Sequence, residues 1–297
     1  MRSVYFGTVS EFSRAALSVL LDHGLDVCGV IVPAVRSHDR PSIAPLVPLN
    51  HSPLQIVNPF ADDTIIQLAW VRHIPVYEVS RLATPKTVSA LSFLQPDIAC
   101  VACFPKRIPA SVLRLSRFGF LNLHPSLLPH YRGPYPLFWT FRNGETHTGV
   151  TIHFMDERFD TGDIAAQAPI DFPDGVSGEE ADRLCATLGG RLLVEVIESL
   201  ERGTLMRRKQ LDGGSYYPAP TNDDFEIDRS WPARRAFNFM RGTSEWGRPY
   251  PIEIDAEHWA LRRAVALAVD ERLDHAYVLS GDEIAIQFNP GVLRARL

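Results

Sequence analysis

Strand-like and helix-like segments alternate along the first 120 residues, and this alternation limits the fold more than any other feature of the chain. Strands are expected at Val4–Gly7, Asp26–Val32, Pro75–Val79 and Asp97–Cys103, and helices at Glu11–His23, Asp63–Val71 and Pro85–Leu94. This order is typical of a mostly parallel sheet with helices on both faces. We therefore expect an α/β fold with a Rossmann-like sheet, in which a ligand binds beyond the carboxyl ends of the strands. Gly-x-Gly-x-x-Gly does not follow the first strand, so no dinucleotide cofactor is predicted.

Another expected strand, Phe120–His124, ends in polar side chains. Because side chains alternate along a strand, Asn122 and His124 project from one face and the leucines between and before them project from the other. Pro125 and Pro129 then bracket a segment that cannot continue the strand. An amide and an imidazole at the end of a strand, followed by a stiff loop, form a candidate site on a rigid scaffold.

The side chains at this strand end suit acyl-transfer chemistry. The Asn122 amide and a protonated His124 can donate to an oxygen that becomes negative in the transition state, and one such donor contributes roughly 3 to 4 kcal/mol. Asp160 is the carboxylate that could hold His124 charged and accept a proton from a nucleophile. Taken alone, an Asp-Thr-Gly segment is more often a turn, with Asp160 as its cap and Gly162 supplying a positive φ. Positioning an amine beside an activated acyl group needs no covalent nucleophile.

Several segments together resemble the 10-formyltetrahydrofolate-dependent formyltransferases. The similar segments are Val4–Thr8, Asn122–Gly133 (Asn-Leu-His-Pro-Ser-Leu-Leu-Pro-x-Tyr-Arg-Gly), Gly149–Ile152 and Asp160–Asp163. The resemblance implies a folate-dependent N-formyltransferase in which Asn122 and His124 stabilise the tetrahedral intermediate. It also implies that Asp160 tunes His124 and helps to move the amine proton.

The resemblance implies a folate pocket as well, with 10-formyltetrahydrofolate as co-substrate. Its walls would come from the loop after the preceding strand, from the Ser-Leu-Leu-Pro loop and from the segment before Asp160. The residues expected there are Phe104, Ile108, Ser126, Leu127, Leu128, Pro129 and Asp156. No metal ligand is implied.

The resemblance covers residues 1–205, which we expect to form the catalytic domain. A long amphipathic helix is predicted over Gly178–Glu201, and Asp212–Ser215 is interpreted as a linker. The remaining expected elements are a helix near Arg234–Arg241 and strands at Pro251–Ile254, Trp259–Leu267 and Glu283–Phe288. They predict a small C-terminal domain over 215–297 that is OB-like or otherwise β-rich, as in several formyltransferase subfamilies.

Bulk composition describes an ordinary globular chain, with 45% hydrophobic and 22% charged residues. No membrane span or secretory pattern is found, so we expect a cytoplasmic protein. Cys100 and Cys103 have the spacing of zinc ligands, but no second pair completes a site, and both are expected in the core of a buried strand. The net charge of −5 argues against a general nucleic-acid binder and leaves room for one local basic face, such as Arg207–Lys209.

The acceptor amine is the least constrained part of the prediction. Residues 33–62 carry only Arg36 and Arg40, which favours a small acceptor such as a nucleotide-linked amino sugar or an amino-acid derivative. The alternative is methionyl-tRNA, whose formyltransferases often carry basic residues in this loop. Residues 33–62 either contact the acceptor or form an ordinary surface loop. Hydrolysis of 10-formyltetrahydrofolate is a less favoured reaction, and the intact trio argues against a folate-binding protein without turnover.

Overall fold

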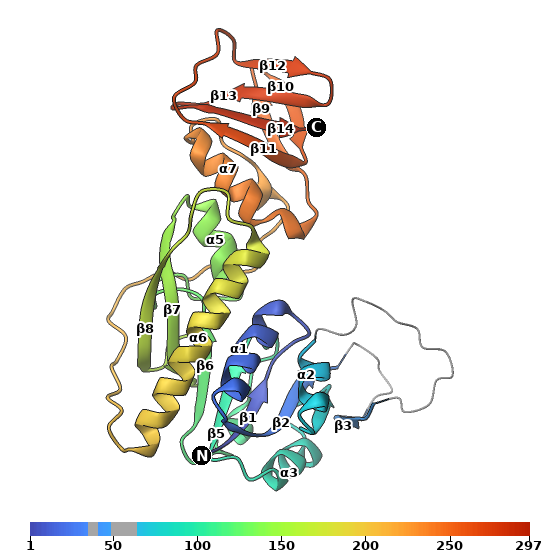
Figure 1. Cartoon of the computed structure of the whole chain (residues 1–297), viewed down its shortest axis with the longest axis vertical. Coiled ribbons are helices and arrows are strands. Elements are labelled where there is room, and N and C mark those ends of the chain that lie inside the picture. The colour runs from blue at the N-terminus through green and yellow to red at the C-terminus, as the bar shows by residue number, and fades with distance from the viewer. Residues whose placement is uncertain (35–40, 49–63) are drawn as a thin grey trace. The chain divides into compact units, whose positions relative to one another are not determined.

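The computed structural model describes residues 1–34, 41–48 and 64–297 of the chain (Figure 1). These residues form two compact units. The first unit contains Met1–Arg132, Gly149–Ala168 and Arg183–Ser215, and the second contains Gly133–Thr148, Pro169–Asp182 and Tyr216–Leu297. Two internal segments therefore belong to the same unit as the C-terminal residues.

An eight-stranded sheet has the order β3-β4-β2-β1-β5-β6-β7-β8. Its strands are β1 (Arg2–Phe6), β2 (Asp26–Pro33), β3 (Ile43–Leu46), β4 (Val76–Val79), β5 (Ile98–Ala102), β6 (Phe120–His124), β7 (His147–Phe154) and β8 (Ile164–Asp171). The five strands from β4 to β6 in this order are parallel, whereas β3 runs antiparallel to β4 and β7 runs antiparallel to β6. The predicted mostly parallel α/β sheet is confirmed.

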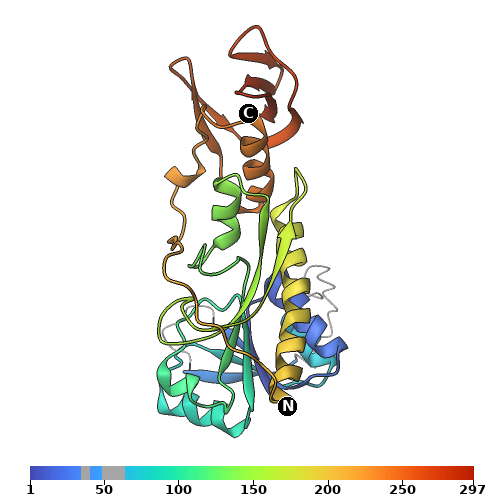
Figure 2. The same cartoon turned by 90° about the vertical axis from the view of Figure 1, so that its left-hand side faces the viewer.

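Helices cover both faces of the sheet in the first unit. They are α1 (Glu11–Asp22), α2 (Ile65–Val71), α3 (Pro85–Phe93), α4 (Ala110–Leu113) and the long α6 (Gly178–Glu201). Figure 2 shows α1 in blue and α6 in yellow on one side of the sheet and α3 in teal on the other. The sequence explains where α1 begins, because the Ser10 hydroxyl accepts a hydrogen bond from the Ser13 amide, as an N-cap does. The predicted start of α1 and both ends of α6 are confirmed.

The two faces of β1 pack against different helices because its side chains alternate. The Tyr5 hydroxyl donates to the Ser13 carbonyl of α1 (2.7 Å), whereas Val4 and Phe6 face the core beneath α3 and α4. On the α6 side, glycine is required for close approach. A Cβ atom at Gly189 would lie 2.5 Å from the Leu123 side chain of β6, so any larger residue would push α6 away from the sheet.

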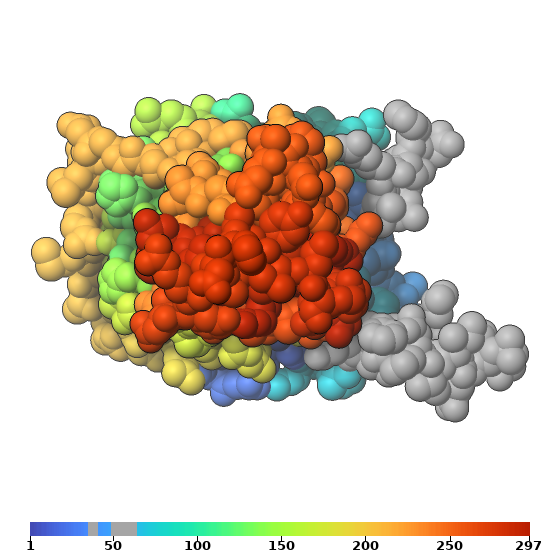
Figure 3. Space-filling view, turned by 90° about the horizontal axis from the view of Figure 1, so that it is seen from above, coloured from blue at the N-terminus to red at the C-terminus, as the bar shows by residue number. Residues whose placement is uncertain are grey.

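The second unit is built from two helices and two small antiparallel sheets. Its elements are α5 (Pro136–Arg142), the 3-10 helices η1 (Asp223–Phe225) and η2 (Ser244–Trp246), α7 (Ala233–Gly242), β9 (Tyr250–Ile254), β10 (Glu257–Leu261), β11 (Arg263–Ala268), β12 (Tyr277–Ser280), β13 (Glu283–Gln287) and β14 (Val292–Arg296). The sheets have the orders β10-β9 and β11-β14-β13-β12. Residues near the C-terminus, red in Figure 3, form a continuous face of this unit. The mostly β character is confirmed, although the single strand predicted at Trp259–Leu267 is two strands, β10 and β11.

The prediction for the cysteines is right for Cys100 and wrong for Cys103. Cys100 is fully buried in β5, and burial raises the pKa of its thiol to about 12. Cys103 is exposed, because β5 ends at Ala102 and the next residue turns with a positive φ of 57°. None of the described helices has the length and hydropathy needed to cross a membrane. Within the same residues, no group of three or more His, Cys, Asp or Glu side chains is arranged to hold a metal ion.

Candidate active site

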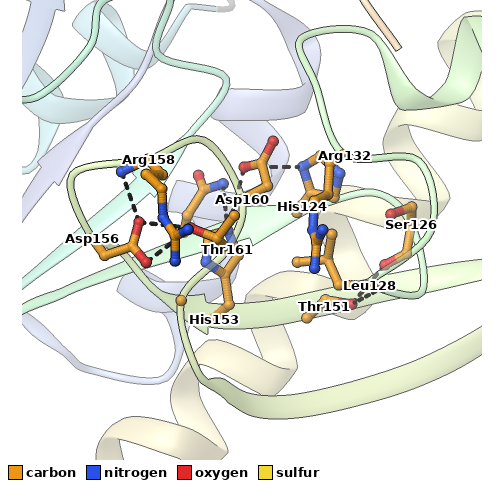
Figure 4. A network of polar contacts seen from close by, with 12 residues as sticks. His124, Ser126, Leu128, Arg132, Thr151, His153, Asp156, Arg158, Asp160 and Thr161 are labelled. Atoms are coloured by element: carbon orange, nitrogen blue, oxygen red, sulfur yellow. Dashed lines mark hydrogen bonds and ion pairs between the residues drawn. The ribbon is translucent and has the colours of Figure 1, made fainter. Parts of the chain in front are cut away.

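The polar face of β6 continues onto β7, its antiparallel neighbour. Asn122 is paired with His153 and His124 with Thr151, so these four side chains project from one face of the sheet. The alternating neighbours Leu121 and Leu123 are buried on the opposite face. The predicted shared face of Asn122 and His124 is thus observed, and two residues that the sequence analysis did not select join it (Figure 4).

Asp160 lies between two imidazoles. Its Oδ1 is 3.7 Å from Nδ1 of His124 and 3.5 Å from Nε2 of His153. The Asp160 side chain is 13% exposed, and those of His124 and His153 are 5% and 2% exposed. The structure therefore brings together Asn122, His124 and Asp160 and adds His153 to them.

The loop that carries Asp160 is held in an unusual backbone conformation. The turn interpretation assigned a positive φ to Gly162, but the residue with the positive φ (54°) is Asp160 itself. Gly162 is needed for another reason, because a Cβ atom there would collide with the Phe154 carbonyl. Asp156 fastens the loop from within, since its carboxylate accepts hydrogen bonds from the Arg158 amide (2.8 Å) and the Thr161 hydroxyl (2.8 and 2.9 Å).

Gln210 fastens the same loop from outside, and the sequence offered no signal for it. Its side-chain amide donates to the carbonyls of Asp160 (2.8 Å) and Gly162 (2.9 Å). Its Oε1 accepts two hydrogen bonds from Arg132, at 3.1 and 2.7 Å. Gln210 thus joins the Asp160 loop to the segment that follows the Ser-Leu-Leu-Pro loop.

The Ser-Leu-Leu-Pro loop is anchored to β7 through Thr151. The Thr151 hydroxyl donates to the Ser126 carbonyl (2.6 Å) and accepts from the Leu128 amide (3.1 Å). Gln167 donates to both the Thr151 hydroxyl and the Leu128 carbonyl, each at 2.9 Å. Ser126 and Leu128 are 0% and 3% exposed, so these two expected pocket residues direct their side chains into the protein.

The remaining expected pocket residues differ in burial. Ile108 is 3% exposed and belongs to the core beneath α3 and α4. Phe104 is half-buried, with its ring 5.4 Å from that of Phe6 in an edge-to-face arrangement. Leu127, Pro129 and Asp156 are also half-buried. Phe104, Leu127 and Pro129 therefore keep part of their apolar surface accessible.

Burial lowers the pKa of the His124 imidazole below its usual value of 6.5, and the nearby His153 lowers it further. Asp160 and the carbonyl of Tyr131 oppose this shift without reversing it. His124 Nε2 lies 2.9 Å from the Tyr131 carbonyl, which can only accept, so Nε2 carries the proton. A lowered pKa and a hydrogen on Nε2 favour a neutral imidazole at neutral pH, with an unprotonated Nδ1 on the side of Asp160, whereas the sequence predicted that Asp160 holds the ring charged.

Comparison with known proteins identifies the family. The family model described as "Formyl transferase" matches residues 1–197. The chain belongs to the formyl transferase family. It is 36% identical over 249 residues to the methionyl-tRNA formyltransferase of Geotalea uraniireducens, covering 83% of this chain and 74% of that protein. It is 31% identical over 293 residues to the methionyl-tRNA formyltransferase of Bacteroides fragilis, covering 96% of this chain and 83% of the relative.

The fold of this formyltransferase is also found in solved structures. The N-formyltransferase of Helicobacter canadensis, in complex with folinic acid and dTDP-3-aminofucose, matches with a TM-score of 0.69 over 100% of this chain and 99% of that one. The sequence identity is 16%, so this likeness shows the shared fold alone.

Proposed function

We propose that this formyltransferase moves the formyl group of 10-formyltetrahydrofolate to a primary amine, with Asn122, His124 and Asp160 as its catalytic residues. The observation that carries the proposal is the placement of the Asp160 carboxylate between the His124 and His153 rings, on the face that also holds Asn122. Residues 1–205 form the catalytic domain in this proposal, and Phe104, Leu127, Pro129 and Asp156 form walls of the folate pocket.

The proposed reaction begins when the amine nitrogen attacks the formyl carbon. The carbonyl oxygen becomes negative, and an N–H of Asn122 donates to it. The attacking nitrogen becomes cationic and gives its proton to Nδ1 of His124. The neutral resting state of His124 suits this step, since only an unprotonated Nδ1 can accept.

Collapse of the tetrahedral intermediate breaks the bond between the formyl carbon and N10 of the folate. N10 takes up the proton that His124 received from the amine, which restores the neutral imidazole. While His124 is charged, Asp160 stabilises it across the 3.7 Å that separate their nearest atoms. The products are the N-formyl amine and tetrahydrofolate, and no metal enters the reaction as written.

We propose methionyl-tRNA as the acceptor, which was the alternative in the sequence analysis. The relatives at 31 to 36% identity described above are methionyl-tRNA formyltransferases, and they favour this acceptor over a small molecule. Most of the expected acceptor loop, 35–40 and 49–62, lies outside the described residues. A local basic face is present elsewhere: Arg207, Arg208 and Lys209 are exposed, and the next residue, Gln210, holds the Asp160 loop. Phosphates of a tRNA acceptor arm could bind there.

A nucleotide-linked amino sugar is the second candidate acceptor, favoured by the net charge of −5 and by the absence of a basic run in residues 33–62 of the sequence. Added salt separates the two candidates. For methionyl-tRNA, log(kcat/KM) should fall with increasing log[salt], with a slope of about 0.9 per phosphate contact. Formylation of an amino sugar should change far less.

A variant sharpens this test. Lys209→Gln should lower the salt slope for methionyl-tRNA by about 0.9, since one phosphate contact is lost, and leave the kcat for a small amine unchanged. Equal salt slopes for the variant and the wild type would remove Lys209 from the acceptor site. A wild type that formylates amino sugars and not methionyl-tRNA would reject the proposed acceptor.

A further inference from the structure

His153 lies against the proposed catalytic residues, but the proposed reaction gives it no role. Its Nδ1 is 3.0 Å from the Phe154 carbonyl, and its Nε2 is 3.1 Å from Nδ2 of Asn122. The side chain is 2% exposed, so water does not compete for either contact. Both nitrogens of the ring therefore have a defined protein partner.

These two contacts determine the protonation of the ring. A carbonyl oxygen can only accept a hydrogen bond, so Nδ1 of His153 carries a hydrogen. In the neutral ring, Nε2 is then unprotonated and accepts an N–H from Asn122. The nitrogen of the Asn122 carboxamide, rather than its oxygen, must therefore lie beside His153.

This orientation matters because the two ends of a carboxamide are nearly equal in shape and opposite in hydrogen-bonding character. Nδ2 of Asn122 has two hydrogens, of which one is bound to His153 and the second remains for a substrate oxygen. In the reversed orientation, Oδ1 would occupy the position of Nδ2 and repel a developing oxyanion. With an apolar residue at position 153, no hydrogen bond to that residue would favour one orientation of the Asn122 carboxamide over the other.

We propose that His153 is a positioning residue that fixes the carboxamide of Asn122 so that an N–H, and not the oxygen, is available to the oxyanion. The inference rests on the proposed function, since it needs an oxyanion at Asn122.

Two charged groups bear on this role. Asp160 Oδ1 lies 3.5 Å from Nε2, farther away than Nδ2 of Asn122 at 3.1 Å. The ring of His124 lies 6.3 Å from that of His153, and His153 lowers the pKa of His124.

Two substitutions separate positioning from packing. His153→Gln places a carbonyl oxygen near the position of Nε2, so an acceptor for Asn122 is kept and the bond to Phe154 is lost. His153→Asn places an amide near the position of Nδ1, so the bond to Phe154 is kept and the acceptor is lost. Asparagine is also smaller than histidine, so a purely structural role predicts that His153→Asn loses folding stability in urea and binds 10-formyltetrahydrofolate more weakly together with any fall in kcat.

We expect formyl transfer to methionyl-tRNA to have a kcat within about threefold of wild type for His153→Gln. For His153→Asn we expect kcat to fall by about ten- to a hundredfold with little change in the KM for 10-formyltetrahydrofolate, as for an impaired oxyanion donor. Equal kcat values for the two variants, or a lower value for the glutamine variant, overturn the inference. A wild type that makes no formylated product with any amine rejects the proposed function instead.

A measurement on the wild type does not depend on the folding of either variant. The ¹⁵N NMR spectrum of the histidine-labelled protein at neutral pH should show His153 with a protonated Nδ1 and an unprotonated Nε2, with the ring signals assigned through their correlations to the His153 backbone. A protonated Nε2 would overturn the inference, because the ring could not then accept from Asn122.

Discussion

The hydroxyl of Thr151 is expected to contribute more to the stability of the first unit than the small size of this group suggests. Thr151 is 0% exposed, and its hydroxyl serves both the Ser126 carbonyl and the Leu128 amide at the base of the Ser-Leu-Leu-Pro loop. Valine has nearly the same shape and no hydroxyl. Thr151→Val would therefore leave two buried backbone groups without these hydrogen bonds, while the methyl groups still fill the space.

The expected cost follows from those two groups. An orphaned buried donor or acceptor costs about 1 to 3 kcal/mol, so two of them should lower the free energy of unfolding by about 2 to 6 kcal/mol. Thr151→Ser is the matched control, because it keeps the hydroxyl and removes one methyl group, at a cost of about 1 kcal/mol. The difference between the variants should thus be about 1 to 5 kcal/mol, with the valine variant less stable.

Urea unfolding followed by circular dichroism measures this difference. If the m value is the same for both variants, the difference between their unfolding midpoints gives the difference in free energy of unfolding. The reasoning would be refuted by a valine variant that is as stable as the serine variant. That result would mean that the Ser126 carbonyl and the Leu128 amide find other partners, and that Thr151 does not anchor the loop.

Three further predictions concern the site. Asn122→Ala and Asp160→Ala should each lower kcat at least about a hundredfold in folded protein, and near-normal turnover of either variant would exclude that residue from the reaction. Gln210→Ala should reduce kcat more than it raises KM, because the Asp160 loop loses two of its backbone hydrogen bonds, and a variant with unchanged kcat would argue against this role. Burial lowers the pKa of His124 below 6.5, so the unfolded chain binds a proton at a higher pH than the folded chain does. Wild type should therefore lose stability below pH 6.5 relative to His124→Gln, by up to about 1.4 kcal/mol per pH unit. Parallel stability curves for these two proteins would contradict the assigned burial effect.

The fold was predictable where local chemistry agrees with tertiary structure. Ser10 caps α1 as expected, and Gly203, with a φ of 68°, follows the end of α6. The predicted spacing of Asn122 and His124 gave their shared face, because alternation along a strand is a property of the backbone alone. Such features depend on neighbours within a few residues of the chain.

The rest depended on partners that are distant in sequence. His153 joins the site only because β7 pairs with β6 in a register that sets it opposite Asn122, and a single strand pattern does not encode register. One signal was available, since Thr151 and His153 are polar residues two apart in the otherwise apolar segment 150–154. Gln210 reaches Asp160 across 50 residues, and nothing local to it indicated the contact. Cys103 was misassigned because the end of β5 falls one residue before it.

The most direct test of the central claim is the fate of the formyl group. Purified protein should be mixed with 10-formyltetrahydrofolate labelled in its formyl carbon and with methionyl-tRNA, and the label followed into N-formylmethionyl-tRNA. The account predicts label transfer in step with tetrahydrofolate release, and loss of both in Asn122→Ala. Tetrahydrofolate released at full rate without any amine, with the label in formate, would contradict it.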